Sequence, residues 1–181
     1  MLFKQSVKRQ VLGVQRLLQC LCGSFAIALG AQISIPFVPI PLTLQTMAVL
    51  FVVSMLGSKG GTIAVLLYLL EGIMGLPVFA GFSSGIWRIL SPTGGYLLGF
   101  VPAVYFSGTL LHRYHNRSFG AIFLAGLVGI LITFVWGYLQ LAYFVGFSRA
   151  YTLGIVPFYA ADLLKLLIFS LWIWTFKKTK K

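Results

Sequence analysis

The sequence predicts an all-α integral membrane protein, folded as a single membrane domain of six transmembrane helices with both termini in the cytoplasm. Of its 181 residues, 59% are hydrophobic and only 9% are charged, and the mean hydropathy is +0.97. A soluble domain of this size has a far more polar composition. The apolar residues fall in runs that are long enough to cross a bilayer as helices, and the basic residues lie between and beyond these runs.

Six apolar runs are expected to span the membrane. A basic amphipathic head over residues 1–16 precedes them, and a basic tail over residues 177–181 follows them. The six runs cover about residues 17–33, 43–56, 61–75, 95–111, 119–144 and 157–176. The head and the first run together could imitate a signal peptide. Cleavage would leave an odd number of spans and move the basic tail outside, so we interpret this run as the first span.

The basic residues orient these spans. With a cytoplasmic N-terminus, eleven of the 14 lysines and arginines fall in inner segments, whereas only Arg88 and Arg149 fall in outer segments and Lys165 lies within the last span. Such an excess of Lys and Arg is typical of cytoplasmic loops. The net charge of +12 is therefore interpreted as a topology signal, and nucleic acid is not expected as a partner because the basic residues form no aromatic-interleaved face.

The last span carries Asp162, which together with Glu71 makes up the two acidic residues of the chain. Lys165 follows Asp162 by three residues, so a helix places both charged groups on one face, together with Phe158. A charged side chain at this depth costs at least ~2.5–3.5 kcal/mol. Since a buried ion pair gains little stability over packed apolar residues, we favour a pocket for a small polar ligand over a purely structural salt bridge.

Two irregular apolar segments are expected beside this pair on the outer side of the membrane. IPFVPIPLTLQT (35–46) holds three prolines in six positions, which prevents a helix. Residues 75–95 form a glycine-rich connector whose length and apolar character are typical of a lid or binding element. Irregular backbone in a membrane must be covered by protein or line a cavity. The sequence therefore predicts one outward-facing cavity, which Tyr96 could also reach.

No catalytic residue, metal site or bound cofactor is expected. Cys20 and Cys22 lie in the first apolar run and His112 and His115 in another segment, so the cysteines are interpreted as packing thiols. GSKGGT (57–62) lacks the spacing of a Walker A motif, so this chain is not expected to hydrolyse ATP.

Four motifs, taken in order along about residues 20–170, resemble those of a known family. They are IPFVPIPLTLQT (35–46), LLYLLEGIMGLPVFAG (66–81), SPTGGYLLGF (91–100) and VPFYAADLLK (156–165). All four are similar to the biotin-specific S component of energy-coupling factor transporters. The resemblance implies a six-helix subunit of the cell membrane that takes up biotin and hands it to a transmembrane coupling subunit and two ATPase subunits. ATP would then be used by the partner subunits only.

The resemblance also implies roles for individual residues. It places Asp162 and Lys165 on the acidic and basic positions that contact the polar groups of biotin. Loop 36–43 would close over the ligand, and loop 75–87 would pack against its rings. Some relatives carry an asparagine where this chain has Gly81, and here a nearby serine would replace it. The substrate-binding residues expected on this basis are Pro39, Phe79, Gly81, Ser83, Ser84, Tyr96, Phe158, Asp162 and Lys165.

Small residues on the first helix are expected to dock the coupling subunit. S components of this family use small residues four apart on this helix, and here the pairs are Ser24 with Ala28 and Ala26 with Gly30. Small side chains let two helices approach closely in a membrane. We therefore expect Ala26, Ala28 and Gly30 to contact the partner.

Other interpretations stay open at this point. The ligand could be another vitamin or a short carboxylate, and the protein could import it alone as a facilitator. Glu71 could belong to the pocket, pair with Arg88 or lie at the interface, and Arg88 could be a lid anchor or a carboxylate clamp. An intramembrane enzyme acting on lipids is the poorest fit, because such enzymes gather several carboxylates or histidines at one depth.

The charge count generates a topology prediction. In a background without Cys20 and Cys22, an impermeant thiol reagent should label Ser118→Cys only from the cytoplasm and Thr152→Cys only from outside, because the two positions lie on opposite sides in the six-span arrangement. Labelling of intact cells and of inverted vesicles measures this. Labelling of both positions from one side would contradict the arrangement.

Overall fold

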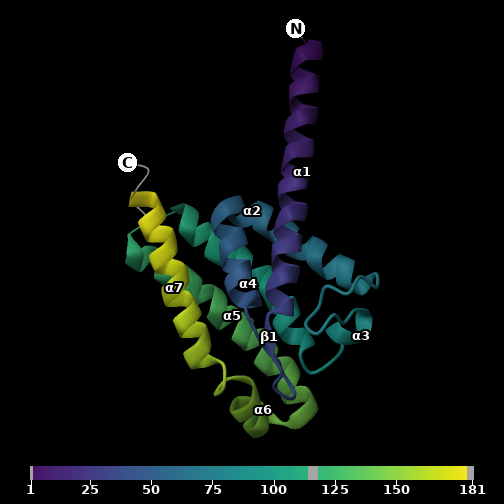
Figure 1. Cartoon of the computed structure of the whole chain (residues 1–181), viewed down its shortest axis with the longest axis vertical. Helices are drawn as coiled ribbons and strands as arrows, with labels where there is room; N and C mark the ends of the chain where they lie inside the picture. The colour runs from purple at the N-terminus through teal and green to yellow at the C-terminus, as the bar shows by residue number, and fades with distance from the viewer. Residues whose placement is uncertain (1, 114–117, 179–181) are drawn as a thin grey trace.

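The computed structural model describes residues 2–113 and 118–178, and the side chains of residues 13–113 and 118–176 among them. Within these ranges the chain is helical apart from a two-stranded sheet and its connecting loops (Figure 1). The elements in order are α1 (Leu2–Gln32), β1 (Ser34–Ile35), β2 (Leu42–Thr43), α2 (Gln45–Ile73), α3 (Ile86–Ile89), α4 (Gly94–Arg113), α5 (Phe119–Val145), α6 (Phe147–Gly154) and α7 (Tyr159–Lys178).

Among the described residues, five helices are long and apolar enough to cross a membrane, which agrees with an all-α, multi-pass membrane protein. The segments are Gly13–Gln32, Gln45–Ile73, Gly94–Arg113, Phe119–Val145 and Tyr159–Phe176. Four of them coincide with the first, fourth, fifth and sixth predicted spans. The second and third predicted spans both fall within α2.

Gly57 divides α2 into two segments that fold back on each other. Its backbone angles are φ 72° and ψ −177°, whereas a helical residue has φ near −63°. A Cβ atom on Gly61 would lie 3.1 Å from the Cα atom of Val53, although eight residues along a straight helix rise by ~12 Å. Residues 45–56 and 58–73 are therefore two helical arms joined by one glycine, where the sequence predicted two spans joined by a short turn.

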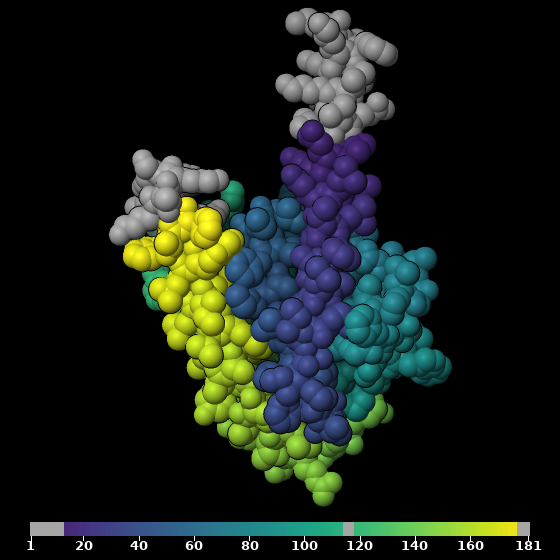
Figure 2. Space-filling view, in the orientation of Figure 1, coloured from purple at the N-terminus to yellow at the C-terminus, as the bar shows by residue number. Residues whose placement is uncertain are grey.

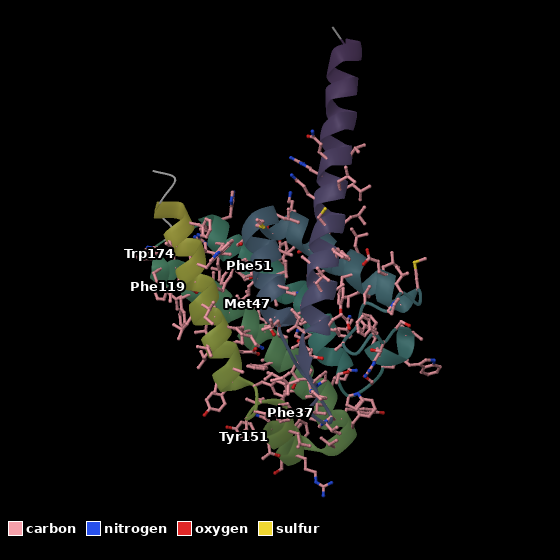
Figure 3. The ribbon with its side chains drawn as sticks, in the orientation of Figure 1. Phe37, Met47, Phe51, Phe119, Tyr151 and Trp174 are labelled. Atoms are coloured by element: carbon pink, nitrogen blue, oxygen red, sulfur yellow. The ribbon has the colours of Figure 1, made fainter. Side chains whose placement is uncertain are left out.

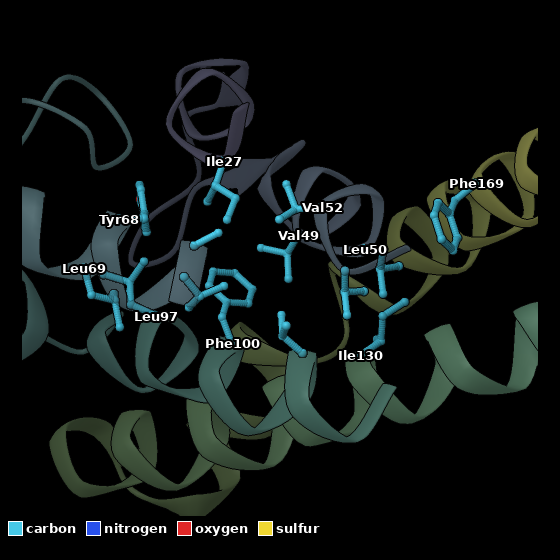
Figure 4. Packing of buried hydrophobic residues seen from close by; sticks show 14 of the residues in the cluster. Ile27, Val49, Leu50, Val52, Tyr68, Leu69, Leu97, Phe100, Ile130 and Phe169 are labelled. Atoms are coloured by element: carbon cyan, nitrogen blue, oxygen red, sulfur yellow. The ribbon is translucent and has the colours of Figure 1, made fainter. Parts of the chain in front are cut away.

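The helices meet in one main apolar core. Its members come from all the helices except α6 and from the loop before α3. Figure 4 shows Ile27, Val49 and Leu97 gathered around the ring of Phe100. Phe169 brings α7 into the same cluster, with its ring edge-on to Phe51 at 5.1 Å. A second, smaller cluster lies around Leu141, where α5 and α6 meet the loop between β1 and β2.

The small residues of α1 pack against α2, which corrects part of the docking prediction. Ala28 is only 7% exposed, and Gly30 is buried so closely that an added Cβ atom would lie 2.7 Å from the Cβ atom of Ala48. Ser24 is completely buried as well. A stripe of small residues allows close approach without specifying the neighbour, and here the neighbour of Ala28 and Gly30 is a helix of the same chain. Ala26 alone of the three is exposed.

The two ends of the helical bundle differ. The start of α1 and the end of α7 lie at one end, and α6 lies at the other (Figure 1). Residues 13–19, the first coloured turns of α1 in Figure 2, are exposed and stand clear of the other helices. Phe37, in the loop between β1 and β2, lies near Tyr151 of α6 at the opposite end (Figure 3).

The backbone of Gly57 leads to a stability prediction. Gly57→Ala should lower the free energy of unfolding by ~1–3 kcal/mol, because an L residue is strained at these angles although the space around Gly57 is open. Gly120→Ala is the matched control, since its Cβ atom also meets open space and its backbone lies within α5. Thermal unfolding in detergent compares the two variants. Equal melting temperatures would show that the fold does not depend on the reversal at Gly57.

Candidate functional site

A cavity opens between the loop that carries β1 and β2, the first arm of α2, the loop before α3, and helices α4, α5 and α7. It encloses about 740 Å³ of space free of protein atoms, part of which is open to solvent. Six of the nine predicted binding residues line it, namely Phe79, Ser83, Tyr96, Phe158, Asp162 and Lys165.

Asp162 and Lys165 form an ion pair in the wall of this cavity. Both are buried, with exposed fractions of 5% and 9%. The Lys165 Nζ atom donates to Asp162 Oδ1 at 2.6 Å and to the backbone carbonyl of Thr43 at 2.7 Å. An ammonium group has three N–H donors, so one remains for a ligand. The salt bridge and the pocket, which the sequence offered as alternatives, are thus present together, and the pair also ties α7 to β2.

Gln45, in the first turn of α2, is a cavity residue that the sequence analysis did not single out. Its side chain is only 4% exposed, and its Nε2 atom has no hydrogen-bond partner within the described part of the chain. A buried polar group without a partner costs ~1–3 kcal/mol. A ligand with an acceptor group would satisfy this amide. The only signal in the sequence was the polar TLQT at the end of the proline-rich segment.

Arg88 also lines the cavity, while Glu71 does not. The Nε atom of Arg88 donates to Ser83 Oγ at 2.8 Å. Glu71 instead accepts a hydrogen bond from Ser24 of α1. The two side chains therefore have separate partners, and only Arg88 brings a charge to the cavity in addition to the ion pair.

Phe79 forms an apolar wall that is fixed from three sides. Its ring occupies the space over Gly72, where an added Cβ atom would lie 2.1 Å from a ring carbon. The ring is edge-on to Tyr68, with 5.5 Å between the ring centres. From α1, Gln32 donates to the carbonyls of Val78 and Phe79 at 3.2 Å and 3.1 Å. The loop before α3 is thus held by α1 and by the second arm of α2.

Three predicted residues do not line the cavity, and their places follow from the loop geometry. Gly81 has φ 69° and the next residue, Phe82, has φ 54°, so the loop bends outward there and leaves Gly81 and Ser84 on the exposed side. Pro39 lies one residue before Ile40, which is 6% exposed and packs into the smaller core cluster. As ligand contacts, these three residues stay untested predictions.

The cavity combines apolar walls with a small number of polar groups. Aromatic rings line it from four places: the loop before α3, helix α4, helix α5 and the residue directly before α7. Tyr96 of α4 is one of them, and its hydroxyl donates a hydrogen bond to the backbone carbonyl of Gly154 at 2.9 Å. The polar groups gather around the Asp162–Lys165 pair, Gln45 and Arg88. Such a site suits a small ligand that has both apolar and hydrogen-bonding parts. The fold and the site define a multi-pass membrane protein that binds a small molecule.

The comparisons with known proteins identify the family. The model of the BioY family matches residues 4–181, and the chain belongs to this family. This confirms the resemblance of the four sequence motifs. The family is one of transporters, which removes the intramembrane enzyme from consideration.

Individual relatives agree with this assignment. The chain is 44% identical over 138 residues to a probable biotin transporter of Pyrococcus horikoshii, covering 76% of this chain and 81% of the relative. It is 41% identical over 146 residues to a biotin transporter of Thermotoga maritima, covering 80% and 85%. Among solved structures, the S-component for biotin from an ECF-type ABC transporter superposes with a TM-score of 0.80 at 26% identity, covering 92% of this chain and 93% of that one.

Proposed function

We propose that this chain is a biotin-binding subunit for biotin uptake, acting as the S component of an energy-coupling factor transporter. The observation that carries this proposal is the buried Asp162–Lys165 pair in the wall of a cavity lined by aromatic and polar side chains, in a chain that belongs to the BioY family. The protein resides in the cell membrane. Another vitamin or a short carboxylate is the alternative ligand.

The chemistry of biotin fits the groups around the cavity. Its ureido ring offers two N–H donors and a carbonyl, which suit the Asp162 carboxylate and the free N–H of Lys165. The amide of Gln45 can donate to the same ring or to the ligand carboxylate. Arg88 suits that carboxylate as well, because a guanidinium binds carboxylates through two parallel hydrogen bonds. The fused rings and the alkyl chain match the aromatic walls.

Six membrane crossings with cytoplasmic termini are part of the proposal. The two arms of α2 supply the second and third crossings, and the other four candidate segments supply the rest. The start of α1 and the end of α7 lie at the same end of the bundle (Figure 1). The charge count places that end in the cytoplasm, so the cavity faces outward.

The partners belong to the proposal too. A transmembrane coupling subunit and ATPase subunits would accept biotin from this chain, and only the ATPase subunits would use ATP. Surrounding lipid covers the exposed apolar faces. The exposed side of α1, with Ala26, is the surface proposed to contact the coupling subunit. Uptake by this chain alone, as a facilitator, is the competing arrangement.

Asp162→Asn is expected to weaken biotin binding roughly ten- to hundred-fold, because a hydrogen bond to a charged group is worth ~1.5–3 kcal/mol. The variant keeps the shape of the side chain and loses the charge. Lys165→Met, which keeps much of the stem and removes the ammonium group, should also weaken binding. Titration of the purified protein with labelled biotin measures both.

The double variant Asp162→Asn/Lys165→Met separates binding from folding. Each single variant strands one buried charge, which can cost ~3–5 kcal/mol of stability. The double variant leaves no unpaired charge, so its melting temperature should recover while its affinity for biotin stays low. A folded double variant that binds biotin as tightly as the parent would rule out this pair as the ligand site.

The exposed face of α1 gives a partner prediction. Ala26→Trp should reduce co-purification of the coupling subunit, because a bulky side chain prevents close approach of another helix, and should leave the affinity for biotin unchanged. Ala160→Trp, at an exposed alanine of α7, is the matched control and should retain the partner. Undiminished co-purification of Ala26→Trp would place the docking surface elsewhere.

A further inference from the structure

Tyr68, in the second arm of α2, is a phenol buried behind the cavity. Its side chain is 0% exposed, and its hydroxyl has no hydrogen-bond partner among the described residues. It does not itself line the cavity. Figure 4 shows Tyr68 at the edge of the main core, near Leu69 and Ile27. A buried hydroxyl in an apolar core costs free energy unless it serves a polar neighbour, so the neighbours of Tyr68 are informative.

The neighbour on the cavity side is Gln45. The reversal at Gly57 brings the two arms of α2 together, with Gly61 packed against Val53. The same antiparallel register places Gln45 of the first arm opposite Tyr68 and Leu69 of the second arm. Gln45 lines the cavity, and its buried Nε2 atom lacks a hydrogen-bond partner within the described chain. Two buried polar groups that lack other partners thus lie next to each other, and one of them belongs to the cavity wall.

The chemistry of the two groups determines which of them donates the hydrogen bond and which accepts it. An amide has two N–H donors and a carbonyl acceptor, and a phenol oxygen can accept one of the N–H groups. Glu71 lies three residues after Tyr68 in the second arm of α2, on the same face of the helix, and its carboxylate attracts the hydroxyl hydrogen. The lone pairs of the phenol oxygen are then left for the Gln45 N–H. This contact would fix which way the amide faces and present its second N–H and its carbonyl to the cavity.

Packing holds the phenol itself in one place. Its ring is edge-on to Phe79, with an angle of 77° between the ring planes, and Phe79 is confined by Gly72 and by the hydrogen bonds of Gln32 to its loop. The Tyr68 hydroxyl therefore has little freedom to move away from Gln45.

We propose that Tyr68 is a positioning residue for ligand recognition: its hydroxyl, which never touches the ligand, orients the Gln45 amide toward it. The choice of biotin as the test ligand rests on the proposed function. The competing explanation is that Tyr68 only fills the core.

Tyr68→Phe removes the hydroxyl and keeps the ring, so it separates the two explanations. Loss of a neutral hydrogen bond is worth ~0.5–1.5 kcal/mol, so the dissociation constant for biotin should rise roughly two- to tenfold. In a Gln45→Leu background, which has no amide to orient, Tyr68→Phe should cause no further loss. Calorimetric titration of the four purified proteins with biotin completes this cycle. Tyr105→Phe, which alters a half-exposed tyrosine of α4, is the matched control and should bind as the parent does.

Each outcome of this cycle decides the inference. The inference is supported if Tyr68→Phe lowers the affinity for biotin in the parent but not in the Gln45→Leu background, with an unchanged melting temperature. An unchanged affinity of Tyr68→Phe, or a loss that is equal in both backgrounds, would assign Tyr68 to packing alone. A parent protein that fails to bind biotin would overturn the proposed function and this inference with it, whereas a binding parent with uncoupled losses would overturn the inference only.

Discussion

The ammonium group of Lys165 is the group around which the cavity-bearing half of the molecule is arranged. It joins the Asp162 carboxylate on its own helix to the carbonyl of Thr43 at the end of the irregular loop. A charge at such depth is costly unless it is paired and hydrogen-bonded. Apolar residues would hold α7 against α2 equally well, so stability alone does not explain the pair. The position of the pair in the wall of a cavity does explain it, because two hydrogen bonds hold the ammonium group and leave one N–H for a ligand.

The loops around the cavity meet a second constraint, which is that backbone groups in a membrane need partners. Two glutamines supply them. Gln32 donates to the carbonyls of Val78 and Phe79, and Gln140 donates to the carbonyls of Ile89 and Ser91 at 2.8 Å and 2.7 Å. Gln45 is different, because it lines the cavity and its buried amide nitrogen has no hydrogen-bond partner in the described structure. The contrast supports a role for Gln45 in ligand binding, because the amide groups of the other two glutamines donate hydrogen bonds that hold loops of the fold in place.

The sequence predicted the parts of this structure that depend on periodicity and composition. The spacing of Asp162 and Lys165 placed them on one face of a helix, and the apolar runs located the spanning helices. Other features depend on contacts that no local pattern specifies. The small residues Ala28 and Gly30 indicated close packing but not the identity of the neighbour, which is α2. The exclusion of Gly81 from the cavity follows from a left-handed bend that includes Phe82, a residue type that seldom adopts it. Gln45 was missed because its significance lies in the absence of a partner.

Helix α1 connects these features mechanically. Its buried face packs closely on α2 at Gly30, its Ser24 hydroxyl bonds Glu71, and Gln32 at its end holds the loop that carries Phe79. Its other face, with Ala26, is exposed. A displacement of the Phe79 wall therefore requires either that Gln32 gives up its hydrogen bonds or that the end of α1 moves with the loop. Unpaired backbone carbonyls are costly in an apolar surrounding, so the hydrogen bonds of Gln32 keep the loop that carries Phe79 bound to the end of α1.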